Sequence, residues 1–158
     1  MQELLNHKIL DVEIATSVVD TDAMWDANAI RFTTETSKIA YLTEADCCSE
    51  TWFSEIINLD FLINQVVTEV VELDMPEFDD GNGRQRYDKF YGYRVATPAG
   101  HCTIAFRNSS NGYYGGSCEL AEKEPKANWV SIKHLTDWTA YGNTDGSYLK
   151  YYKLKAFW

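Results

Sequence analysis

The chain has 158 residues, of which 45% are hydrophobic and 14% aromatic, and its formal net charge is −10. This length fits one domain with a sizeable core, and this composition excludes a disordered chain. No apolar run approaches the ~18 residues of a membrane span, and the first residues lack the basic and apolar segments of a secretion signal. We therefore expect a soluble intracellular protein whose four cysteines are thiols.

The charge is divided unevenly along the chain. Residues 1–80 hold 18 acidic and 3 basic side chains, whereas residues 81–158 hold 6 acidic and 11 basic ones. An acidic face repels nucleic acid and can imitate it toward a basic protein, although the same charge also keeps a protein in solution. The asymmetry therefore points to a polar partner surface.

Most of the chain has the pattern of β-strands. Alternating or β-branched runs separated by turn residues predict strands over 8–14, 29–35, 38–43, 66–73, 86–96, 101–107 and 113–120. The first three are joined closely enough to form an antiparallel meander. Within 86–96, alternation places Tyr91, Tyr93 and Val95 on one face, and Asn108–Gly112 reads as a hairpin turn.

One helix is expected after the third strand, over residues 46–58. Asp46 and Ser49 are suitable N-cap residues, and Phe53, Ile56 and Ile57 follow at helical spacing. The predicted class is therefore α+β, with an antiparallel sheet of about six to eight strands and one main helix packed on one face. We assign residues 1–120 to a core domain and 121–158 to a C-terminal extension packed on it, in which 129–138 fits a short helix or a strand equally well.

Two motifs together resemble a group of small phage and prophage proteins of unknown function. They are Asp46-Cys47-Cys48 and Ser110-Asn111-Gly112-Tyr113-Tyr114, with an aromatic-rich strand around Phe90–Val95 between them. The likeness extends from residue 8 to about 120, and the chain departs from the group at Ser49, where glutamate is common. The resemblance implies a phage-borne accessory protein and implies no activity.

Cys47 and Cys48 are the candidate reactive thiols. At a helix N-terminus the dipole would lower a thiol pKa, and His101 with Asp46 would then complete a nucleophilic site. The alternative is ordinary packing of one thiol and partial exposure of the other. Adjacent cysteines lack the ligand spacing of zinc sites, so we predict no metal and no cofactor.

The leading hypothesis is a protein that acts by binding and is not an enzyme. It would inhibit a host defence system, as anti-CRISPR or anti-restriction proteins do, by presenting an acidic surface that mimics DNA to a basic nucleic-acid-binding protein in the host cytoplasm. The partner-binding residues would be Asp74, Glu77, Asp79, Asp80, Tyr91, Tyr93, Tyr113 and Tyr114.

Three other functions are also compatible with the sequence. The alternatives are an oligomeric sponge for a nucleotide signal held by Arg84, Arg86 and Arg94, a cysteine-dependent enzyme, and a virion component. A homo-oligomer is compatible with each of the binding functions. Direct binding of nucleic acid is not expected, because phosphate affinity requires a cationic surface.

Overall fold

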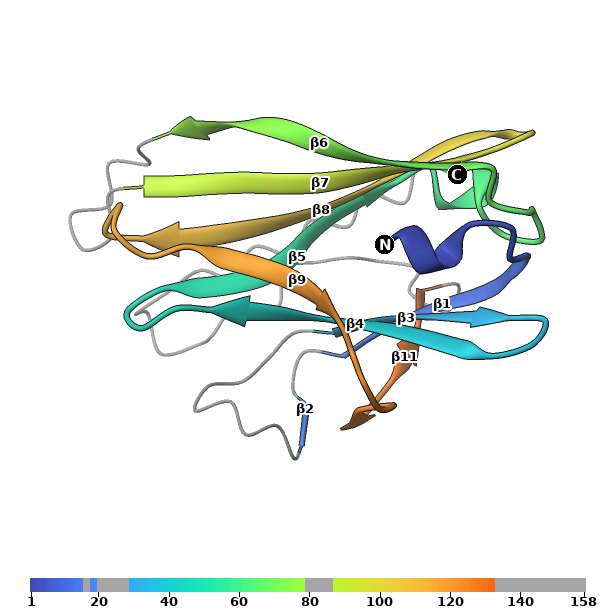
Figure 1. The fold of residues 1–158 in the computed structure, drawn as a ribbon, viewed down its shortest axis with the longest axis horizontal. Helices are drawn as coiled ribbons and strands as arrows, with labels where there is room; N and C mark the ends of the chain where they lie inside the picture. Colours follow the sequence, from blue (N-terminus) through green and yellow to red (C-terminus); the bar gives the residue numbers. More distant parts are fainter. Residues whose placement is uncertain (16–17, 20–28, 79–86, 133–158) are drawn as a thin grey trace.

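The computed structural model describes residues 1–15, 18–19, 29–78 and 87–132, and these form two antiparallel β-sheets that face each other (Figure 1). The first sheet has the strand order β11-β1-β3-β4-β9, and the second has the order β5-β8-β7-β6. A short additional pair joins β10 and β2. Each sheet turns one apolar face inward, so the core lies between the two layers.

Each sheet takes strands from both halves of the chain. The first-sheet strands are β1 (Ile9–Ala15), β3 (Ala29–Thr34), β4 (Lys38–Ala45), β9 (Gly116–Leu120) and β11 (Val130–Ser131). The second-sheet strands are β5 (Glu50–Ile57), β6 (Glu69–Phe78), β7 (Tyr87–Thr97) and β8 (Gly100–Ser110), and the extra pair is β2 (Val18–Val19) with β10 (Lys126–Ala127). The predicted meander of the first three strands is confirmed as β1-β3-β4.

The expected α+β class is wrong, because residues 50–57 form strand β5 instead of a helix. The described residues contain only two helical turns, the 3₁₀ segments η1 (Gln2–Leu4) and η2 (Leu59–Phe61). A bulge between Phe53 and Glu55 places Phe53 opposite Phe106 and Ile56 opposite Ile104. An extra residue in a strand shifts its period locally, so two residues three apart face the same side. The apparent helical spacing is therefore the signature of a bulged strand.

The core is built from the inner faces of both sheets. Its largest fully buried side chains come from the first sheet (Ile9, Val12, Ile30, Phe32, Tyr41), from the second (Ile56, Val95, Ile104), from the segments that close one end (Leu4, Leu62, Val67) and from Ile132 just after β11. Those end segments pair with each other, since the Asn6 amide donates to the Val67 carbonyl and the Asn64 amide to the Ile9 carbonyl. One end of the sandwich is thereby covered by η1 and by the chain around η2.

The chain after β9 crosses the outer face of the first sheet. It leaves at β9, one edge of that sheet, and returns as β11 beside β1 at the other edge. On the way, Trp129 and Ala127 cover a second apolar cluster made by Ala15 and Ala29. Residues 121–132 are therefore an integral part of the first layer. Residues 133–158, including most of the ambiguous segment 129–138, lie outside the described residues.

Candidate functional site

The two sequence motifs meet at one end of the sandwich. Asp46 to Ser49 form the turn from β4 to β5, and Asn111 to Gly115 form the turn from β8 to β9. The Asp46 amide donates to the Gly115 carbonyl at 3.2 Å, and the Gly115 amide donates to Asp46 Oδ2 at 3.1 Å. Ser49 Oγ donates to the Gly115 carbonyl at 3.1 Å. Asp46 of the first motif and the residues that directly follow the two motifs, Ser49 and Gly115, therefore hold the two turns between the sheets together.

Buried polar groups continue this junction toward β9. Asn108 Nδ2 donates to Thr51 Oγ1 at 2.9 Å, and Thr43 Oγ1 donates to the Thr51 carbonyl at 3.1 Å. All three side chains are buried, so each hydrogen bond replaces one that water would otherwise make. Gly116 packs directly against this group, which fixes where β9 begins.

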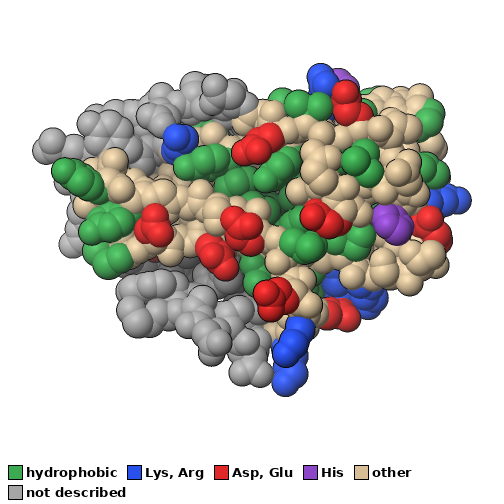
Figure 2. Space-filling view, viewed as in Figure 1, with side chains coloured by type: hydrophobic (Ala, Val, Ile, Leu, Met, Phe, Trp, Pro, Cys, Tyr) green, Lys and Arg blue, Asp and Glu red, His purple; other side chains and the backbone are tan. Residues whose placement is uncertain are grey.

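Below the junction, the sheets part around a cavity of about 380 Å³. Figure 2 shows this face of the molecule, where acidic side chains stand around apolar surface in the middle and basic side chains lie toward the margin. The cavity lies between β9 and β4 on one side and β6, β7 and β8 on the other. Its lining is Met1, Glu3, Tyr41, Glu72, Tyr91, Tyr93, Phe106, Gly116, Ser117, Cys118, Glu119 and Leu120.

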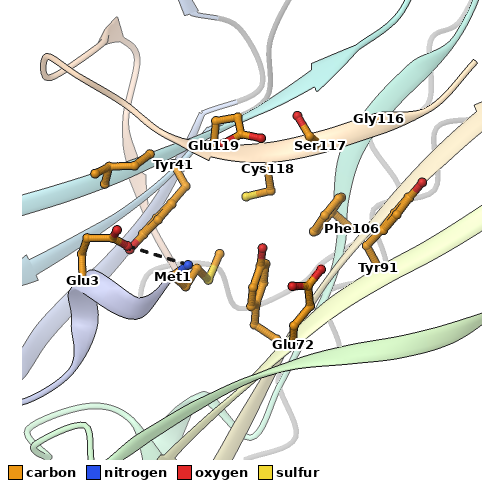
Figure 3. Close-up of a pocket in the computed structure, with 12 residues that line it drawn as sticks. Met1, Glu3, Tyr41, Glu72, Tyr91, Phe106, Gly116, Ser117, Cys118 and Glu119 are labelled. Carbon is orange, nitrogen blue, oxygen red and sulfur yellow. Dashed lines mark hydrogen bonds and ion pairs between the residues drawn. The ribbon is translucent and has the colours of Figure 1, made fainter.

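Rings form one wall of the cavity. Tyr91 stacks on Phe106 with ring centroids 4.9 Å apart and planes 7° apart, and Tyr93 stacks on the same ring at 6.2 Å. The register explains the arrangement, because Tyr91 is the cross-strand partner of Phe106 and Tyr93 is two residues further along β7. In Figure 3, Glu72 and Cys118 project toward the cavity from opposite sheets, while Ser117 and Glu119 project to the other side of β9.

The polar groups of the cavity are predominantly acidic. Tyr41 Oη donates to Glu3 Oε2 at 2.8 Å, and the Met1 ammonium lies 3.8 Å from the same oxygen. Within the described part of the chain, no lysine or arginine forms an ion pair with Glu72 or Glu119. The lining itself contains no lysine and no arginine. The cavity and its rim therefore have an excess of negative charge.

Burial, reinforced by this negative charge, shifts the pKa values of groups that line the cavity. Burial, followed by the nearby Cys118, Glu72, Glu119 and Glu3, raises the pKa of Tyr93 to about 12. Burial also raises the pKa of Cys118 to about 12. Burial and the hydrogen bond to Glu3 raise the pKa of Tyr41, whereas the Glu3 pKa is lowered by a backbone hydrogen bond and by Tyr41. The site resists additional negative charge.

We expect stability to fall as the pH rises above about 9. The ordinary pKa values are 9.0 for Cys118 and 10.0 for Tyr93, and both rise to about 12 in the fold. Between those values the unfolded chain loses protons that the folded chain keeps, so unfolding becomes progressively easier. Denaturant unfolding at a series of pH values measures the effect, and Cys118→Ser should reduce the slope near pH 9 to 10. An unchanged slope in that variant would contradict the assignment.

The structure separates the four predicted tyrosines into two pairs. Tyr91 and Tyr93 are half-buried in the cavity wall, and Tyr113 is 93% exposed in the β8–β9 turn beside the less exposed Tyr114. They do not form one surface patch. The backbones of Asp74 and Glu77 lie in β6 opposite Tyr91 and Lys89. The side chains of Asp74 and Glu77 lie outside the described part of the structure, as do Asp79, Asp80, Arg84 and Arg86.

The cysteines do not form the nucleophilic site that the sequence left open. No helix begins at Asp46, so no helix dipole acts on Cys47, and the hydrogen bond between Cys47 and Cys48 raises the pKa of Cys47. His101 lies near the start of β8, whereas the thiols adjoin Glu50, which pairs with Ser109 near the end of β8. At ~3.3 Å per strand residue, that separation is roughly 25 Å. Arg94 of the nucleotide hypothesis forms an ion pair with Glu69 at 3.1 Å.

Sequence reasoning missed Glu3, Tyr41, Glu72 and Glu119 as cavity residues. They come from η1, β4, β6 and β9, which are distant in sequence and meet only through sheet pairing and layer packing. The only local signal was the alternation in β7 that puts Tyr91 and Tyr93 on one face. No local sequence pattern predicts that acidic residues lie beside these two tyrosines in the cavity.

The fold and the site define a two-layer β-protein with an acidic, aromatic cavity between its sheets. The chain belongs to the DUF7448 family, a domain of unknown function whose profile matches residues 2–120. The expectation of an uncharacterised family is therefore confirmed. Neither the curated proteins nor the solved structures contain a match. Among the described residues, no helix has the length and apolar character needed to cross a membrane.

Proposed function

We propose that this protein acts by binding a basic protein partner, and that the cavity between the sheets receives a cationic side chain of that partner. The observation that carries the proposal is the lining, in which carboxylates and tyrosine rings surround the space without a lysine or an arginine. Ammonium and guanidinium groups gain both from nearby carboxylates and from aromatic rings. No other common side chain combines these preferences.

The chain itself makes such contacts, one of them with a ring of the cavity wall. The Lys89 ammonium lies 5.5 Å from the centroid of the Tyr91 ring, and the Arg107 guanidinium lies 5.5 Å from that of Trp52. The Tyr91 ring thus already attracts a cation although Lys89 is not one of the residues that line the cavity. Two of the cavity carboxylates, Glu3 and Glu72, come from the strongly acidic first 80 residues.

A partner that normally holds nucleic acid fits this charge distribution best. A net charge of −10 repels phosphate and attracts a basic cleft. This long-range attraction raises the rate at which the two proteins associate. The proposal therefore includes the finer hypothesis of a phage-borne inhibitor of a host defence nuclease, acting in the host cytoplasm through its negative potential. The excess of acidic residues in the first half of the sequence and the aromatic wall of the cavity both support this hypothesis.

The test is calorimetric titration of an arginine- and lysine-rich peptide into the protein. We expect Glu72→Gln combined with Glu3→Gln to weaken binding by about tenfold, since each partly exposed charge pair is worth at most ~1 kcal/mol. Glu44→Gln is the matched control, because Glu44 is exposed on β4 and does not line the cavity. Its affinity should stay within about twofold.

Salt supplies an independent readout of the same proposal. Screening shortens the range of exposed charges to about 10 Å at 0.1 M, so the affinity should fall steadily with added salt. Binding that is equally strong in molar salt, or equal in the cavity variant and the Glu44→Gln control, would rule out the proposed site.

A further inference from the structure

The turn between β4 and β5 presents two adjacent thiols to solvent. Cys47 and Cys48 are both exposed, neither forms a disulfide, and their sulfur atoms lie 3.3 Å apart. Cys48 has a φ of 63°, a left-handed conformation that is uncommon outside glycine. Neither thiol belongs to the cavity described above.

The backbone under this thiol pair is held in place from several directions. The Ser49 amide donates to the Asp46 carbonyl at 3.1 Å, and the single Ser49 hydroxyl proton is shared between that carbonyl, at 2.9 Å, and the Gly115 carbonyl. The Asp46 side chain accepts from the Gly115 amide, which ties the turn to the neighbouring β8–β9 turn. The separation of the two sulfurs is thus supported by a braced turn, which lowers the entropy cost of binding one ligand through both.

The separation selects the kind of atom that would bridge the sulfurs. With sulfur bonds of ~2.3 Å, sulfurs 3.3 Å apart subtend about 90° at a shared atom, whereas a tetrahedral centre needs about 3.8 Å. A direct disulfide needs sulfurs ~2.0 Å apart and Cα atoms at least ~4.4 Å apart. Adjacent residues have Cα atoms only ~3.8 Å apart, so that bond would be strained.

We propose that Cys47 and Cys48 form a bidentate site for a single thiophilic atom that bonds at near right angles, of the class of trivalent arsenicals. In the reaction with a hydrated organoarsenical, R–As(OH)₂, two As–S bonds form and two As–O bonds break. Each thiol proton leaves with one hydroxide as water, and neither arsenic nor sulfur changes oxidation state. The overall reaction consumes two thiols and releases two waters, with each sulfur attacking as the thiolate and its proton passing to the departing hydroxide, so no oxidant is needed.

Phenylarsine oxide is the probe for this site. We expect one phenylarsenic group per chain by intact mass spectrometry, with the loss of two thiols reactive toward a chromogenic disulfide reagent. The adduct should survive excess glutathione and be removed by 2,3-dimercaptopropanol, because only a dithiol can replace both sulfurs at once. An adduct that glutathione displaces would contradict chelation.

Single substitutions separate chelation from simple thiol reactivity. Cys47→Ser and Cys48→Ser should each weaken retention of the arsenical by at least about 100-fold, since the second bond forms at a high effective concentration. Cys118→Ser is the matched control, because Cys118 lies in the cavity wall and should leave retention unchanged. Equal retention in the wild type and the two turn variants, or tight zinc binding that needs both turn thiols, would overturn the proposal. Unchanged thermal melting of the turn variants establishes that they fold.

Discussion

Replacing Arg31 by alanine is expected to cost about 3–5 kcal/mol of stability, the range for removing one partner of a buried ion pair. Arg31 is 6% exposed on the outer face of the first sheet. Its Nε and Nη2 donate to the two carboxylate oxygens of Glu13 at 2.8 Å each, and its Nη1 donates to Glu124. The guanidinium also lies 4.3 Å from the centroid of the Trp129 ring.

The cost arises because Arg31 joins the sheet to the segment that crosses it. Without the guanidinium, Glu13 keeps a largely buried charge with no partner, and Glu124 and Trp129 lose their contact with β3. Arg31→Lys should recover only part of the loss, since an ammonium cannot make the paired contacts with Glu13 while it stacks on the ring.

Thermal melting measures this prediction, with an expected decrease of roughly 10 °C for the alanine variant. Arg94→Ala is the matched control, because Arg94 forms one exposed ion pair with Glu69 and should cost at most ~1 kcal/mol. A double variant that also changes Glu13 to Gln should be more stable than Arg31→Ala, as the unpaired charge is then removed. Equal melting temperatures for Arg31→Ala and Arg94→Ala would refute the role of this network.

Replacing Gly116 by alanine is expected to destabilise the junction by about 2–4 kcal/mol, since overpacking and lost buried hydrogen bonds act together. A Cβ at Gly116 would lie 2.0 Å from Thr51 Oγ1 and 2.8 Å from Asn108 Nδ2. Both atoms belong to the buried hydrogen-bonded group and cannot move without breaking it. The start of β9, and with it one wall of the cavity, would have to shift.

The adjacent glycine provides the control. A Cβ at Gly115 would meet only Asp46 Oδ2, at 3.8 Å, which is an ordinary contact. Gly115→Ala should therefore change stability by no more than about 0.5 kcal/mol. Chemical denaturation of the two variants compares them directly, and binding of the basic peptide should weaken in Gly116→Ala alone. Similar stability in both variants would show that the close approach at Gly116 is not limiting.

The strands could be predicted because their evidence is local. Alternation and β-branched content marked the regions that become β1, β3, β4, β7 and β8, and short connections implied antiparallel neighbours. The region of β5 could not be predicted in the same way, because its bulge depends on pairing with β8. Phe53 and Ile56 share a face only after that pairing, so their spacing in the sequence favoured a helix.

The candidate site was predictable only in part. Strand alternation predicts that Tyr91 and Tyr93 share a face, and the family resemblance pairs the two turn motifs, whose turns are joined in the structure by the bond from Gly115 to Asp46. Glu3 and Glu119 are separated by most of the family region, and no local rule brings them to one cavity. Residues 74–80, the acidic segment that the sequence favoured, contribute no described side chain to it.

The sequence by itself determined the β-rich pattern, the acidic first half and the motif residues, because composition and alternation are properties of neighbouring positions. Only the tertiary structure decided that two sheets replace a sheet with a helix, and that carboxylates from distant segments and a wall of aromatic rings meet around one cavity. Sheet register and layer packing create those proximities between residues far apart in the chain, and burial among them sets the charge that a ligand would meet.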